Sequence, residues 1–148
     1  MVAAYCYVAR ANDLLYFFDL DPSPNRILLA EAAAKAALRL RPDSAEAHFA
    51  MADYHFRCHR DFEHAEKELA LARPGLPNST PFFILSGYIN RRRNHWPEAE
   101  RDSSPAVSLD PRNPYAYNLL ADTYLLQRRF AEAVQVYENV FANGEQTP

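Results

Sequence analysis

The strongest structural pattern in this chain lies in residues 114–143, PYAYNLLADTYLLQRRFAEAVQVYENVFAN. Two sets of apolar and small residues recur there at spacings of three and four: Tyr117, Leu120, Ala121 and Tyr124, and then Phe130, Ala133, Tyr137 and Val140. Such spacing places each set on one face of a helix. The segment therefore predicts two amphipathic helices joined by a short turn, with small residues where the two helices touch.

The same pattern recurs upstream at an interval of 34 residues. The aligned pairs are Gly87 with Ala121, Trp96 with Phe130, and Ala99 with Ala133. A third copy, residues 45–79, has one extra residue and carries Ala52, Phe62, Ala65 and Ala72 in the matching positions. A fixed period of this length is typical of helical repeat proteins, in which each repeat packs on its neighbours. We therefore predict an all-α fold built of helix pairs.

The small residues and prolines of these copies resemble the tetratricopeptide repeat (TPR) family. In all three copies the small residue late in the first helix is matched (Ala52, Gly87, Ala121), as is the alanine early in the second helix (Ala65, Ala99, Ala133). The family's closing proline is matched by Pro42, Pro77 and Pro111. The resemblance implies a right-handed α-solenoid of antiparallel helix pairs that acts in protein–protein interaction.

Four residues depart from the family pattern. His55 and Asn90 stand where Tyr124 shows the family's tyrosine, and Met51 and Ser86 replace a leucine. We expect these departures to weaken individual repeats without changing the fold.

The whole chain, residues 1–148, is predicted to form one domain with helix pairs at about 2–42, 45–79, 80–113 and 114–143. The first pair has a longer turn, in which Ser23 and Pro24 form a typical helix start. This elongated first repeat resembles the TPR regions of bacterial adenylate cyclases, protein kinases and winged-helix regulators, and so implies a larger bacterial signalling protein.

Pro105 is expected to kink or end its helix near residues 102–104.

Composition and net charge limit the compartments and the kinds of partner that we expect for this chain. A chain of 148 residues can bury a continuous core without disulfides, and its two cysteines, Cys6 and Cys58, favour a reducing, cytoplasmic compartment. The net charge of -3 argues against sequence-independent nucleic-acid binding. The most apolar segment, residues 14–20, is too short to span a membrane or to act as a signal peptide. We therefore expect neither nucleic acid nor a membrane as partner.

The TPR resemblance implies that the first helices of the pairs line a concave groove. The residues left over after the packing positions are filled are Glu46, Phe49, Asp53, Phe56, Arg57, Ile84, Tyr88, Arg91, Arg92, Asn118, Asp122 and Leu125. Aromatic residues without a packing role beside arginines suit a peptide with apolar anchors and an acidic group. Alternatively, these residues only face solvent or rest on their neighbours. Asp53 and Asp122 do not fit the family's clamp for chaperone tails.

Three other chemistries receive little support. His55, Cys58 and His59 share a helical face, but no further ligand pattern accompanies them, so we expect no metal and no cofactor. No nucleophile stands in a recognisable turn, which predicts that the protein is not an enzyme. The run at residues 91–93 could contact nucleic acid with Trp96, yet Trp96 is expected to be buried in its repeat position.

The last predicted helix leaves an apolar face without a visible cap, made of Val136, Val140 and Phe141. Stacked repeats need a cover at each end. The chain is therefore expected to continue in a longer protein or to pair with a second copy as a homodimer. A structural role in self-assembly is the alternative to a ligand in the groove.

Overall fold

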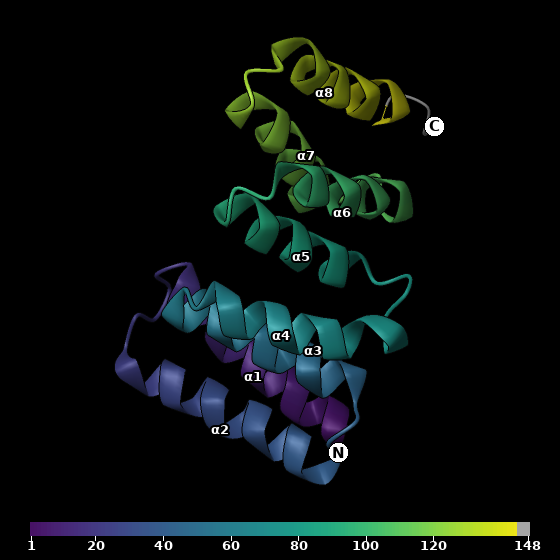
Figure 1. Ribbon diagram of the computed structural model, residues 1–148. Helices are drawn as coiled ribbons and strands as arrows, with labels where there is room; N and C mark the ends of the chain where they lie inside the picture. Colours follow the sequence, from purple (N-terminus) through teal and green to yellow (C-terminus); the bar gives the residue numbers. More distant parts are fainter. Residues whose placement is uncertain (145–148) are drawn as a thin grey trace. The chain divides into compact units, whose positions relative to one another are not determined.

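The structure is a computed structural model that describes residues 1–144, apart from the side chains of Phe141 and Asn143. Its helices are α1 (Val2–Phe17), α2 (Pro24–Leu40), α3 (Ala45–Tyr54), α4 (Phe62–Ala72), α5 (Thr80–Arg92), α6 (Trp96–Leu109), α7 (Pro114–Leu126) and α8 (Phe130–Gly144), as Figure 1 shows. A π-helix, His55–His59, continues α3, and a 3-10 turn, Arg73–Gly75, follows α4. The predicted all-α fold class is confirmed across this described part of the chain.

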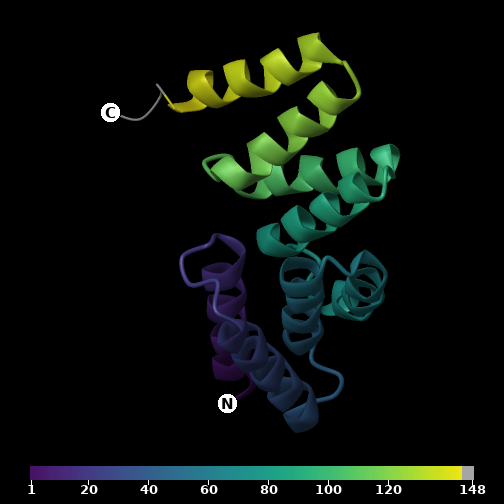
Figure 2. The same ribbon diagram turned by 90° about the vertical axis from the view of Figure 1, so that its left-hand side faces the viewer.

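The helices divide into two compact units, Met1–Pro77 and Asn78–Pro148, which we call unit 1 and unit 2. In unit 1, α1 packs against α2 (Figure 2), α3 packs against both of them, and α4 packs against α3. In unit 2, α5 pairs with α6, α7 pairs with α8, and α7 also contacts α5 and α6. Each unit thus holds two of the predicted helix pairs, while a single domain over the whole chain stays a prediction.

The repeat interval is visible in the backbone of the turns inside the pairs. Arg60, Asn94 and Arg128 have φ values of 54°, 61° and 61°, and they follow one another at the 34-residue interval. The first pair has its equivalent in Asp19, with a φ of 59°. Residues other than glycine rarely adopt this left-handed conformation, so its recurrence is a property of the repeat.

Small residues lie where the helices cross, as the repeat pattern predicted. Ala65, Ala99 and Ala133 are all buried. A Cβ atom added to Gly87 would lie 2.7 Å from Leu119 Cδ2 and 3.0 Å from Ser103 Oγ. Because both neighbours are buried, only glycine lets α5 approach α6 and α7 this closely.

Helix α6 continues through Pro105 to Leu109, so an early end near residues 102–104 is wrong, while a kink there stays a prediction. Proline removes a single backbone hydrogen bond, to the carbonyl of Arg101, and Arg101 is exposed to water. Contacts with α5 and α7 hold the rest of the helix in place. Within the described residues, no helix combines the length and the apolar character that a membrane crossing requires.

Candidate functional site

The face of unit 1 formed by α1, α3 and the π-helix is built around Asp53, which is 1% exposed. Arg57 Nε donates to Asp53 Oδ1 at 2.6 Å, one helical turn away. Arg10 Nε, from α1, lies 3.4 Å from Asp53 Oδ2, which is within ion-pair range but lacks the geometry of a hydrogen bond. One buried carboxylate is therefore shared unequally between two guanidinium groups.

Aromatic rings support both arginines on this face. Arg10 Cζ lies 5.2 Å from the ring centre of Phe49, and Arg57 Cζ lies 4.9 Å from that of Phe17. The rings of Phe17 and Phe56 are 6.2 Å apart. Phe49 and Phe56 are buried. The prediction that these two aromatics have no packing role is wrong, because cation–π contacts and ring packing engage them. We call Arg10, Phe17, Phe49, Asp53 and Arg57 the α1/α3 face.

Arg10 and Phe17 are two members of this face that sequence reasoning missed. Both belong to α1, which lies upstream of the three copies related by the 34-residue interval. The signal was available, since the first helix of every pair should line the same face. Extending the assignment to α1 would have selected an arginine and a phenylalanine of the same kind as Arg57 and Phe56.

A second carboxyl group lies buried beside this face. Asp13 of α1 is fully buried, its Oδ1 accepts a hydrogen bond from Cys58 Sγ at 3.2 Å, and its Oδ2 has no partner. Burial, together with the nearby charge of Asp53, raises the pKa of Asp13 from 3.8 to about 8. Burial and the neighbouring Asp13 also raise the pKa of the Cys58 thiol. At neutral pH, Asp13 is therefore mostly a neutral acid.

The corresponding face of unit 2 is formed by α5 and α7. Arg91 Nη1 of α5 donates to Asp122 Oδ2 of α7 at 3.1 Å, and Arg91 Cζ lies 5.0 Å from the ring centre of Tyr88. The side chain of Asp122 is 48% exposed. The structure thus brings together three of the predicted groove residues, which come from two different helix pairs.

The other predicted residues of unit 2 are more scattered. Asn118 Oδ1 accepts a hydrogen bond from the hydroxyl of Tyr137, at 3.2 Å, which links α7 to α8. Ile84 is half-buried, and Arg92 and Leu125 are exposed. Sequence reasoning used Tyr137 only as a packing residue. We call Tyr88, Arg91, Asn118 and Asp122 the α5/α7 face.

Two departures from the family pattern prove to act together in unit 2. Ser86 Oγ donates to Asp102 Oδ2 at 2.5 Å, and Asn90 Nδ2 lies 3.2 Å from the same oxygen. All three side chains are buried. One buried carboxylate oxygen on α6 thus joins the two polar residues of α5.

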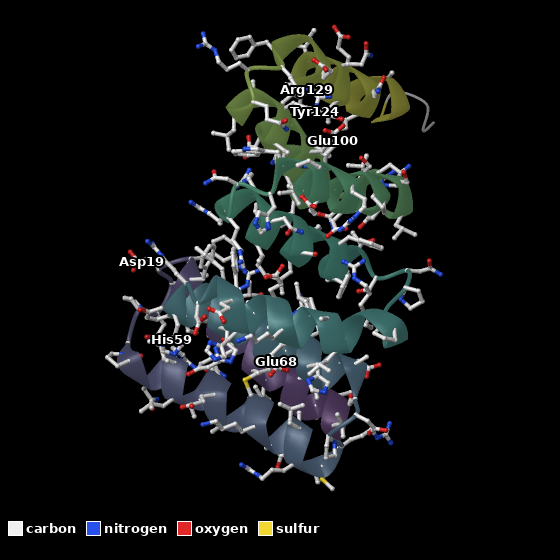
Figure 3. The ribbon with its side chains drawn as sticks, viewed as in Figure 1. Asp19, His59, Glu68, Glu100, Tyr124 and Arg129 are labelled. Carbon is white, nitrogen blue, oxygen red and sulfur yellow. The ribbon has the colours of Figure 1, made fainter. Side chains whose placement is uncertain are left out.

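The last pair keeps the family's tyrosine, Tyr124, which contacts a carboxylate and a guanidinium group. Tyr124, Glu100 and Arg129 lie together in Figure 3. The hydroxyl of Tyr124 donates to Glu100 Oε1 at 3.1 Å, and Arg129 Nη1 donates to Glu100 Oε2 at 2.6 Å. Arg129 also stacks on the Tyr124 ring, with Cζ 4.4 Å from its centre. These contacts tie α6 to the turn between α7 and α8.

The histidine and cysteine group of the π-helix does not converge on one point. His59 Nε2 lies 2.7 Å from the Tyr54 hydroxyl, His55 stacks on His64 with ring centres 5.4 Å apart, and Cys58 faces Asp13. Among the residues that the structure describes, no three His, Cys, Asp or Glu side chains are placed to hold a metal ion.

The residues predicted for self-association lie on α8. Val136 and Val140 are half-buried, and the side chain of Phe141 lies outside the described residues. The exposed large apolar side chains of this last pair include Tyr115, Leu125, Leu126, Phe130 and Val134.

The antiparallel helix pairs, with small residues at their crossings, give the chain an α-helical repeat fold. The tetratricopeptide repeat family model matches residues 106–135. A comparison with curated protein sequences finds no match.

Solved structures share this fold over nearly the whole chain. A Pseudomonas aeruginosa structure, described as a functional characterization of PilF, is 20% identical, with a TM-score of 0.71 over 98% of this chain. A mutant of MamA is 13% identical, with a TM-score of 0.64 over 96% of this chain and 77% of its own. The present chain covers 65% of the PilF chain. At these identities the likeness establishes the TPR-like solenoid fold alone.

Proposed function

We propose that this chain is a non-catalytic protein–protein interaction module, an adaptor or scaffold, that binds a peptide or partner segment on its first-helix faces. It would act as part of a larger bacterial signalling or regulatory protein. The observation that supports the proposal is the contact between Arg91 and Asp122 beside Tyr88, because it joins charged and aromatic side chains from separate helix pairs. Aromatic and arginine side chains supply much of the binding energy at protein interfaces.

The exposure and contacts of these side chains support the proposal. The Arg91 side chain is 12% exposed and is held by Asp122 and by the Tyr88 ring, so little side-chain entropy would be lost when its exposed part meets a partner. Half of the Asp122 side chain remains in solvent, where a partner's amide or amine can donate to it. Arg92 is exposed on the next position of α5 and would meet an acidic group. Asn118 would set orientation through its amide.

The test is a capture experiment from source-cell lysate, read by mass spectrometry. The wild-type chain is compared with an Arg91→Glu, Arg92→Glu variant and with an Arg39→Glu, Arg41→Glu control. The control makes the same charge change at exposed positions at the end of α2, in unit 1. A protein retained by wild type and control but lost by the first variant identifies the partner. Equal captures by all three would reject the proposal, provided that circular dichroism gives the same melting temperature.

Self-assembly through the end of α8 is the alternative function. It would use Val136, Val140 and Phe141 as an apolar contact between two copies. Light scattering distinguishes the two, because a chain that stays strictly monomeric at high concentration has no such contact, whatever its groove binds.

A further inference from the structure

The arginines of the α1/α3 face of unit 1 carry more positive charge than the carboxylate between them neutralises. Arg10 and Arg57 share the single carboxylate of Asp53. The second acid beside this face, Asp13, is fully buried. Its Oδ1 accepts a hydrogen bond from the Cys58 thiol rather than from a cation. A neutral Asp13 leaves two guanidinium groups against one carboxylate, a net charge of about +1 at neutral pH.

Arg10 is the guanidinium that remains available. Arg57 has the short contact with Asp53, at 2.6 Å, whereas Arg10 Nε is buried without a hydrogen bond and lies 3.4 Å from the other oxygen. The ring of Phe49 holds the Arg10 guanidinium in position, and 31% of the side chain is exposed. A guanidinium has five N–H donors in a planar fork that matches a carboxylate.

We propose that Arg10 binds a carboxylate of an acidic partner segment on the α1/α3 face, and that the proton on Asp13 maintains the positive charge that attracts this segment. The inference rests on the proposed function and adds the partner's chemistry and its regulation in unit 1. Loss of the proton would add a buried negative charge beside Arg10 and Arg57. Both arginines would then be neutralised within the protein.

The groups that act on Asp13 come from three elements of unit 1. They are Arg10 on α1, Asp53 on α3, and Arg57 and Cys58 on the π-helix. Besides burial, the charges of Glu31 on α2 and of Asp13 also raise the pKa of Tyr54 on α3. Burial and the charge of Glu31 raise the pKa of Tyr54 to about 12, and the pKa of Cys58 is raised as well. Neither group therefore loses a proton between pH 7 and 9, where Asp13 does.

The test uses the full chain and two dye-labelled peptides, one of alternating glutamate and alanine and one of alternating glutamine and alanine. Fluorescence anisotropy at low salt should show that the wild-type chain binds the glutamate peptide and not the glutamine peptide. Arg10→Gln should weaken that binding roughly five- to tenfold. Arg10→Lys should restore part of it, because the charge returns without the fork.

Arg39→Gln provides the matched control, since it removes the same charge from an exposed position on α2. Its affinity should stay close to that of wild type. Equal losses for Arg10→Gln and Arg39→Gln, or a wild-type chain that prefers neither peptide, would overturn the proposal.

The pH arm compares wild type with Asp13→Asn. Wild-type affinity for the glutamate peptide should fall as the pH rises from 7 to 9, whereas the Asn variant, which stays neutral, should keep its affinity. The same pH dependence in both proteins would reject the role of the proton. Capture of a lysate protein through Arg91 and Arg92 depends on unit 2, so it can succeed while the peptide assay fails. In that outcome, only the inference about unit 1 is lost.

Discussion

Units 1 and 2 have an aspartate at equivalent repeat positions, Asp53 and Asp122, but differ in how far they bury it. Asp53 is 1% exposed and forms ion pairs with two arginines, whereas the Asp122 side chain is 48% exposed and forms an ion pair with Arg91. In unit 1, α1 contributes groups to this place, because Arg10 lies against Asp53 and the ring of Phe17 lies against Arg57. The same position in the repeat therefore forms a buried ion pair in one unit and a half-exposed ion pair in the other.

The largest expected effect comes from removing each carboxylate in turn. Asp53→Ala leaves two guanidinium groups without their buried counter-charge, which should lower the free energy of unfolding by about 3–5 kcal/mol. Asp122→Ala breaks a partly exposed pair and should cost less than about 1 kcal/mol. Urea unfolding followed by circular dichroism measures both. Similar costs for the two variants would mean that the difference in burial has no energetic consequence.

A smaller effect, confined to unit 1, concerns the pH dependence of stability. The pKa of Asp13 is raised from 3.8 to about 8, so the folded state holds this proton more tightly than the unfolded chain does. The stabilisation is complete below pH 3.8, declines as the pH rises toward 8 and is absent above that. The decline should be at most about 1.4 kcal/mol per pH unit.

Asp13→Asn should remove this decline. His55 acts in the opposite sense at lower pH, because burial lowers its pKa, but it is the same in both proteins and cancels in their difference. Unfolding free energies of the two proteins at intervals from pH 5 to 9 provide the measurement. Parallel curves would show that Asp13 does not hold the proton. Asp122→Asn, in unit 2, serves as the control and should leave the dependence of the wild type intact.

The sequence predicted those features that depend on the repeat alone. The 34-residue interval anticipated the helix pairs, and the small residues such as Ala99 are buried as expected. These positions are determined within one repeat and its neighbour, where the spacing is visible in the chain.

The features that could not be predicted depend on pairs of residues that the interval does not relate. The burial of Phe49 follows the placement of Arg10, which belongs to another helix pair. Ser86 and Asn90 are separate departures from the family pattern in the sequence, and the structure joins them through Asp102. Arg91 and Asp122 were selected from the sequence individually, but their contact required the crossing of α5 and α7.

The smallest expected effect concerns the turns inside the helix pairs. It tests whether these turns are energetically alike in two units whose first-helix faces differ. Arg60 in unit 1 and Arg128 in unit 2 both hold a left-handed backbone in the turn of their pair, with exposed side chains. A side chain costs roughly 1–2 kcal/mol in this conformation and glycine does not, although glycine loses more entropy on folding. Arg60→Gly and Arg128→Gly should therefore each stabilise the protein by about 0.5–1 kcal/mol.

Asn94→Gly should gain less, because asparagine tolerates the left-handed conformation better than arginine does. Thermal unfolding of the three variants gives the comparison. Equal gains at Arg60 and Arg128 would indicate that the turns are energetically the same in both units, so that the contrast between Asp53 and Asp122 arises from the faces alone. A gain in one unit with a loss in the other would instead place part of that contrast in the backbone of the repeat.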